Sequence, residues 1–133
     1  MKGNFIMKLD FDCVRDILLE CEKTSLNQHL LLGQLSSALP KYSEDEIAYN
    51  CLKLKEAGYI SVVTMAGGRD INIVKVKDIT FQGHEFLNTI RSPKIMTHSK
   101  NIASKIGATS IQAFTQIASG VVLTLIKSEL GFS

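Results

Sequence analysis

Residues 52–60 have the sequence LKLKEAGYI, which joins the end of a predicted helix to the start of a predicted strand. Gly58 stands where a left-handed residue commonly ends a helix, and the apolar and aromatic residues that follow favour extended chain. Residues 78–87, DITFQGHEFL, show the reverse change, from a strand into a helix that Thr80 is expected to begin. Neither stretch is specific alone. Together they predict a two-stranded hairpin, with its turn at 66–70, between two helices.

Three helices are predicted before this hairpin, each with its own start or stop signal. Asp10 is expected to cap a helix over 11–21, whose apolar residues repeat at i, i+3, i+4 and i+7. Residues 29–39 are rich in leucine and predict a second helix, which ends before Pro40 because a residue that precedes proline avoids the α region. Ser43 opens a capping box, S-E-D-E, at the start of the third helix. The predicted core stripe of that helix is Ile47, Cys51 and Leu54.

Helix, helix, helix, hairpin, helix within about 80 residues is the element order of a winged-helix domain. We therefore predict an α+β, mainly helical fold. It consists of a winged helix-turn-helix domain over 8–91 and a C-terminal helical extension over 92–133, which serves packing or oligomerisation. The extension is expected to form two helices broken near Gly107, with Ser110 as the cap of the second and a broad apolar face along it.

The composition suits one small globular domain with an appendage. The chain has 133 residues, 45% of them hydrophobic and 21% charged, and its formal net charge of +2 is too small to indicate a polyanion partner by itself. The charge is uneven, since residues 1–91 hold 11 Lys+Arg against 12 Asp+Glu and residues 92–133 hold 4 against 1. The predicted winged-helix domain is therefore faintly acidic, and the tail is basic.

The cysteines and the apolar segments predict a cytoplasmic protein. Cys13, Cys21 and Cys51 are odd in number, lack CxxC spacing and lie on or near apolar helix stripes, which favours buried, reduced thiols. The first residues lack the apolar stretch of a signal peptide, and Met7 is an alternative start. Residues 106–126 carry no charge, but their two glutamines and several hydroxyl groups favour a soluble packing helix over a membrane span.

Four segments are shared with a known family: MKLDFDCVRDILL at 7–19, YSEDEIAYNCLKLKEAGYI at 42–60, ITFQGHEFLNTIR at 79–91, and a glycine-interrupted tail ending LIKSELG at 125–131. The chain resembles an uncharacterised family of short bacterial and prophage-encoded proteins, a domain of unknown function related to the YjcQ-like winged-helix proteins. TFQGHEFL is its most specific motif. This chain lacks two tryptophans common in the family and has Phe81 and Met96 in those regions. The resemblance implies the fold and a bacterial or prophage setting, and it implies no catalytic residues.

The motifs that suggest catalysis or metal binding are incomplete. His84-Glu85 begins like the zinc-protease motif HExxH, but Asn88 stands where the second histidine is required. Gly67-Gly68 lacks the Lys-Ser/Thr of a phosphate-binding loop, so it is expected to be a turn. The three histidines lie far apart, without acids or cysteines at ligand spacing. We therefore predict a non-enzymatic protein with no metal, no cofactor and no evident small-molecule substrate.

Duplex DNA is one expected partner, because the third helix of a winged helix usually enters the major groove. If the core stripe faces inward, Asn50 and Lys53 face outward, where Asn50 pairs with adenine and Lys53 meets phosphate. The acidic residues 44–46 oppose this function, since carboxylates repel phosphate. Their alternative role is to stabilise the positive end of the helix dipole on a solvated surface.

The predicted wing has the opposite charge. If Val74 and Val76 face the core, Lys75 and Lys77 face outward, with Arg69 at the tip. This basic patch lies where wings meet the DNA backbone, although lysines on an exposed strand also serve solubility. The sequence therefore predicts a DNA-binding, transcription-regulatory protein in which the wing contributes most of the contact.

The alternative is a protein-interaction or assembly module that binds no nucleic acid. Tyr49 and Leu52 are expected to lie exposed on the third helix, and the last helix has more apolar surface than a peripheral helix needs. We predict a homo-oligomer formed through that last helix. The residues expected on the partner face are Tyr49, Leu52, Ile111, Phe114, Ile117, Val121 and Leu125.

Overall fold

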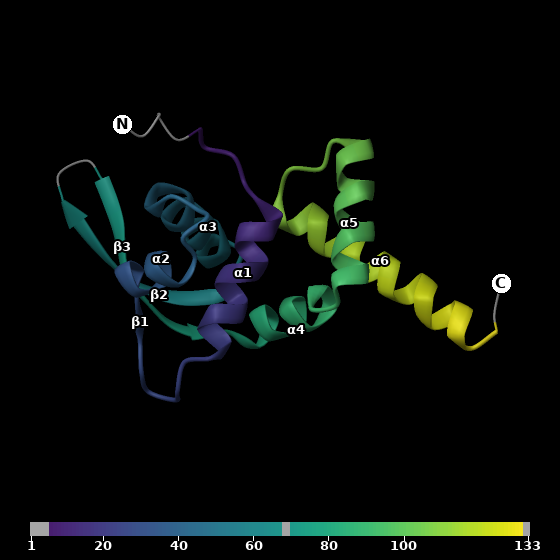
Figure 1. Ribbon diagram of the computed structural model, residues 1–133, viewed down its shortest axis with the longest axis horizontal. Helices are drawn as coiled ribbons and strands as arrows, with labels where there is room; N and C mark the ends of the chain where they lie inside the picture. Colours follow the sequence, from purple (N-terminus) through teal and green to yellow (C-terminus); the bar gives the residue numbers. More distant parts are fainter. Residues whose placement is uncertain (1–5, 68–69, 132–133) are drawn as a thin grey trace.

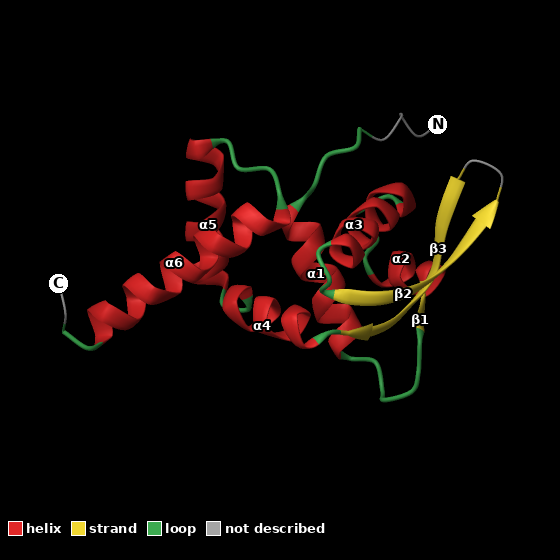
Figure 2. Ribbon diagram, turned by 180° about the vertical axis from the view of Figure 1, so that it is seen from behind, coloured by secondary structure: helices red, strands yellow, loops and turns green. Residues whose placement is uncertain are grey.

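The structure is a computed structural model, and it describes residues 6–67 and 70–131. Its elements are α1 (Phe11–Glu22), β1 (Leu30–Leu31), α2 (Leu32–Ala38), α3 (Glu44–Glu56), β2 (Ile60–Gly67), β3 (Asp70–Ile79), α4 (Phe81–Ile90), α5 (Pro93–Ile106) and α6 (Ile111–Glu129). Within the described residues the fold is therefore α+β and mainly helical, as predicted, with one three-stranded sheet (Figures 1 and 2).

The two stretches that predicted the hairpin contact each other directly. Gly58 has a φ of 81° and follows the end of α3, as expected for a left-handed residue after a helix. The Thr80 hydroxyl donates to the Gly58 carbonyl oxygen at 2.6 Å, and the Thr80 backbone N–H donates to the Tyr59 carbonyl oxygen at 3.0 Å. Thr80 also accepts from the Gly83 N–H and so caps α4. The start of the hairpin is thus joined to its end.

Four further predicted helix boundaries are also confirmed. Asp10 accepts hydrogen bonds from the first backbone N–H groups of α1, and Ser43 exchanges two hydrogen bonds with Glu46 in the predicted capping box of α3. Gly107, with a φ of 72°, ends α5, and Ser110 caps α6. Short polar side chains and left-handed residues therefore set where these helices begin and end.

The prediction of one helix over 29–39 is wrong in its first part. Leu30 and Leu31 form β1, which pairs antiparallel with β3 opposite Val76 and Lys75. The helix α2 begins only at Leu32. A two-residue strand has too few positions to show an alternating pattern, and this leucine-rich stretch suits a buried helix equally well.

The sheet has the order β1-β3-β2, and both strand pairs are antiparallel. The pairing of β2 with β3 shifts twice, so β3 carries an extra residue at Val74 and another at Lys77. These bulges break the alternation expected of a regular strand. Among the β3 residues whose burial the structure describes, the buried ones are consequently three apart rather than two: Ile73, Val76 and Ile79.

The core is continuous from the sheet to the C-terminal helices. Helix α1 lies between α3, α4 and the sheet, and its buried side chains join those of every neighbouring element. The extension contributes to the same core, because Phe114 of α6 is fully buried and its ring stacks on Phe11 at a centroid distance of 4.0 Å. The rest of α6 extends away from the sheet (Figure 1). The division at residue 91 stays a prediction.

Candidate nucleic-acid and partner surfaces

The start of α3 is acidic and exposed. Glu44 and Asp45 are exposed side chains in its first turn, whereas Glu46 is half-buried and accepts a hydrogen bond from the Ser43 N–H at 3.1 Å. Carboxylates at this end stabilise the helix dipole. They also surround the end of the helix that would approach phosphates, so this surface favours a cation or water over DNA.

The expected outward orientation of Asn50 is wrong, because this side chain is buried with 0% exposure. Its Oδ1 accepts from the Asp10 backbone N–H at 3.1 Å, and its Nδ2 donates to the Glu46 carbonyl oxygen at 2.8 Å. Asn50 thus connects α3 to the residue that caps α1. Both ends of its amide are occupied, so it has no free group for an adenine base.

The remaining predicted residues of α3 are only half-exposed. Lys53 forms an ion pair with Glu56 at 2.9 Å, and this hydrogen bond raises the pKa of Lys53. The Lys53 ammonium group also lies 5.3 Å from the centre of the Tyr49 ring. Leu52 packs partly against the core. Neither Tyr49 nor Leu52 therefore forms the fully exposed apolar surface that was expected.

The lysines predicted on the wing differ in exposure. Lys77 lies at a bulge and is exposed, whereas Lys75 is half-buried on the central strand, between Leu31 of β1 and Val63 of β2. Arg69 lies outside the described residues. The hairpin itself extends beyond the helices on the side away from α5 and α6 (Figure 1). Lys77 is consequently the predicted wing residue best placed to meet a partner.

The predicted partner face of α6 divides into two parts. Ile111 and Phe114 are buried within the chain's own core, so their assignment to a partner face is wrong. Ile117, Val121 and Leu125 are half-buried. The exposed large apolar residues of α6 are instead Leu123, Ile126 and Leu130, the last just beyond the helix, at 53%, 49% and 65% exposure. Periodicity identified the apolar helix but did not show which of its sides the body covers.

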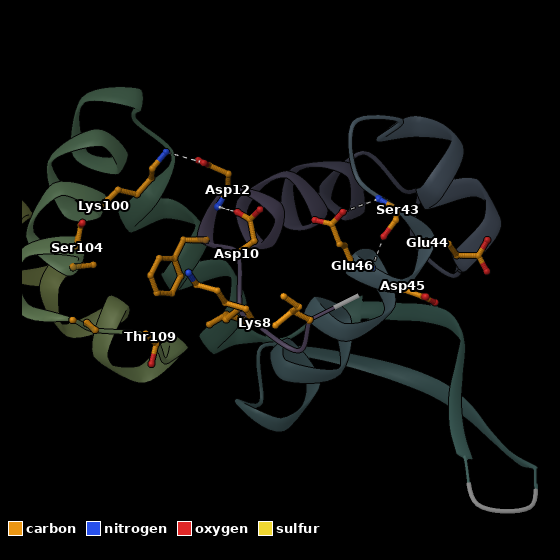
Figure 3. A pocket seen from close by; sticks show the side chains of 16 residues that line it. Lys8, Asp10, Asp12, Ser43, Glu44, Asp45, Glu46, Lys100, Ser104 and Thr109 are labelled. Atoms are coloured by element: carbon orange, nitrogen blue, oxygen red, sulfur yellow. Dashed lines mark hydrogen bonds and ion pairs between the residues drawn. The ribbon is translucent and has the colours of Figure 1, made fainter. Parts of the chain in front are cut away.

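A cleft of about 1230 Å³ opens between the N-terminal segment, the start of α3 and the α5–α6 turn (Figure 3). Its inner carboxylates already have structural partners: Asp10 caps α1, Glu46 accepts from the Ser43 N–H in the capping box of α3, and Asp12 forms a 2.7 Å ion pair with Lys100. Glu44 and Asp45 point away from the cleft at its rim. Sequence reasoning missed this cleft because three distant segments form it.

The three cysteines are buried and free, as predicted. Burial raises the pKa of Cys13 and of Cys21 to about 12, and it raises the pKa of Cys51 as well. A thiol acts as a nucleophile or metal ligand only as its thiolate. These side chains therefore serve packing.

The family model described as "Hypothetical protein (DUF2513)" matches residues 8–110, from before α1 to the cap of α6. The chain belongs to this family, which confirms the expected membership of an uncharacterised family. It is also 26% identical over 121 residues to a protein of Haemophilus influenzae described as "Uncharacterized protein", a match that spans 90% of this chain and 99% of that protein. No solved structure matches the chain significantly.

Proposed function

We propose that residues 8–91 form a winged-helix domain related to the YjcQ-like proteins. The element order α1-β1-α2-α3-β2-β3-α4 supports this, because it places three helices before a hairpin and one helix after it. The sheet order supports it too, since β1, between the first two helices, pairs with the second strand of the hairpin. The remaining residues form the proposed helical extension.

We further propose that this domain binds duplex DNA as a regulatory protein of bacterial or prophage origin. The projecting β2–β3 hairpin carries the proposal (Figure 2). It leaves the body of the protein, and near its base β3 has Lys77 exposed, with Lys75 half-exposed two residues closer to the turn. Lysines placed in this way neutralise phosphates and supply affinity that is independent of sequence.

The proposed contact is mainly to the DNA backbone. Asn50 is occupied by its own hydrogen bonds, Lys53 is paired with Glu56, and the exposed start of α3 is acidic. Sequence reading requires side chains that reach base edges in a groove. We therefore expect weak preference among DNA sequences and strong dependence on salt.

The test is the affinity for random duplex DNA at several salt concentrations. Lys77→Glu is expected to weaken binding to all sequences and to reduce the slope of log affinity against log salt by about one, as loss of one phosphate contact does. Lys105→Glu is the matched control. It makes the same charge change at the end of α5, far from the hairpin (Figure 1), and is expected to leave the slope unchanged.

Two outcomes count against DNA binding. Absence of binding to random duplex at low salt removes the proposal altogether. Equal weakening by Lys77→Glu and Lys105→Glu shows that only overall charge matters and that the hairpin is a solvated surface. A third variant, Asp45→Asn, is expected to strengthen non-specific binding to duplex DNA, because it removes a carboxylate that repels phosphate.

We also propose that the protein is non-enzymatic and cytoplasmic. The raised pKa values of the three cysteines support a structural role for these nucleophilic side chains. Buried thiols without disulfides suit a reducing compartment.

The second candidate function is a protein-assembly module without nucleic-acid binding. The exposed apolar residues of α6 favour it specifically, because they form a surface that the rest of the described chain leaves partly open. Assembly is compatible with DNA binding, since both surfaces can act in one molecule.

A further inference from the structure

The second half of α6 carries an apolar stripe that projects from the body. Leu123, Ile126 and Leu130 are spaced three and four residues apart, so they lie on one side of the helix. Ile126 and Leu130 of this stripe also line an apolar groove of about 320 Å³, which Ile95 of α5 closes on its other side. Figures 1 and 2 show this end of α6 extending away from the sheet and from α1.

We propose that this surface binds the same surface of a second copy of the chain. Two-fold pairing places a patch against itself, so the patch must be self-complementary. The stripe meets this requirement, because it is apolar and has both signs of charge at its edges, Lys127 and Glu129. The adjacent groove accepts apolar side chains, and the stripe of the other copy presents leucine and isoleucine.

The position of the stripe also favours a second copy. Because the stripe lies on a projecting helix end, two such ends can lie side by side while their bodies remain apart (Figure 1). The area is small. Stable interfaces bury about 1,200–2,000 Å² in total, roughly half of it from each partner, and three exposed side chains beside a small groove are expected to supply less than one partner's share. We therefore expect a weak dimer whose population depends on protein concentration.

A lipid bilayer is the main competing occupant. Among the helices of the described residues, α6 is the one that is long and apolar enough to cross a membrane. Within the structure, 22% of its most apolar stretch of 18 residues is buried. Its first half is held in the protein core by Phe114 and Ala118, so only the second half is free to insert. The edges of the stripe carry one base, Lys127, and one acid, Glu129, rather than the cluster of basic residues that draws a helix to an anionic lipid surface. These features favour the second copy.

The experiment is sedimentation equilibrium of the full chain from low to high micromolar concentration, without DNA. The wild-type mass is expected to rise from 14.7 kDa toward twice this value. Ile126→Glu, and separately Leu130→Glu, are expected to hold the mass at one chain, because a buried unpaired carboxylate opposes association. Thr124→Glu is the matched control, since Thr124 is exposed and lies about 120–160° around the helix from Leu130 and Ile126, and it is expected to leave association unchanged.

Circular dichroism of each variant checks that the fold is retained. A wild-type chain that stays monomeric at high micromolar concentration overturns the proposal. Equal loss of association in Thr124→Glu and Ile126→Glu also overturns it, because the contact is then not specific to the stripe. If the monomer instead floats with phosphatidylserine vesicles, and Ile126→Glu prevents this, the surface is assigned to lipid. None of these outcomes depends on the DNA-binding proposal.

Discussion

Gly83 lies where α4 passes closest to the start of β2, and no larger residue fits there. A Cβ atom at this position would lie 2.0 Å from the Tyr59 carbonyl oxygen and 2.7 Å from the side chain of Ile79. The glycine in the motif TFQGHEFL is therefore a packing requirement. It allows the end of the hairpin and the helix that follows it to contact the chain after Gly58.

Gly83→Ala is expected to lower the free energy of unfolding by about 2–3 kcal/mol, because backbone must shift to admit the methyl group. Gly33→Ala is the matched control. Gly33 is in α2 with no neighbour within 4 Å of an added Cβ, so alanine there is expected to be neutral or to stabilise by up to about 1 kcal/mol. Urea unfolding measures both variants. A Gly83→Ala protein as stable as wild type would mean that the close approach to Tyr59 relaxes freely.

Asn50 shows why residue roles were harder to predict than residue positions. Its place on α3 was correct, and a polar residue beside a core stripe is usually exposed. The structure buries it because its amide satisfies the Asp10 backbone N–H and the Glu46 carbonyl oxygen together. The Asp10 partner is 40 residues away, and no local pattern in the sequence predicts such a distant hydrogen bond.

Among the elements, helix ends were predictable because their signals are local. Asp10, Ser43, Thr80 and Ser110 each accept from a backbone N–H within three residues. The short strand β1 and the two bulges of β3 depend instead on pairing between distant segments. Their positions follow from how the strands meet the core, which the sequence pattern alone does not determine.

Thr80 joins the hairpin to α4. Substitution of its side chain therefore tests how far the segments 52–60 and 78–87 depend on each other for stability. Thr80→Ala removes the cap of α4 and the hydrogen bond to the Gly58 carbonyl oxygen. We expect a loss of about 1–2 kcal/mol in the free energy of unfolding. Thr80→Ser keeps the hydroxyl group and is expected to retain most of that stability. Equal losses in the two variants would assign the effect to the threonine methyl group instead.

At the scale of the whole molecule, the core does not stop where the predicted winged-helix domain ends. Phe114 stacks on Phe11 and meets Phe86 edge-on at 6.5 Å, and the Tyr59 hydroxyl lies 3.0 Å from the Thr115 hydroxyl. The apolar face of α6 was visible in its periodicity. The periodicity did not show that one half of α6 is covered and the other half is open, because this division depends on where α5 and the rest of the chain lie relative to α6.

Two truncations test this division. A chain that ends after Ser119 keeps Phe114 and Ala118 and loses the projecting half of α6, whose Val121 and Leu125 are only half-buried, so its free energy of unfolding is expected to fall by about 1–2 kcal/mol. A chain that ends after Thr109 loses Phe114 and exposes the ring of Phe11, and we expect a fall of at least about 3–5 kcal/mol, as for removal of one buried phenylalanine. Phe114→Ala in the full chain removes the same ring by a single substitution, and its loss in free energy of unfolding is expected to lie in the same range. Denaturant unfolding followed by circular dichroism measures all three. Equal losses in the two truncated chains would contradict the division of α6, because the projecting half would then contribute as much stability as the buried half.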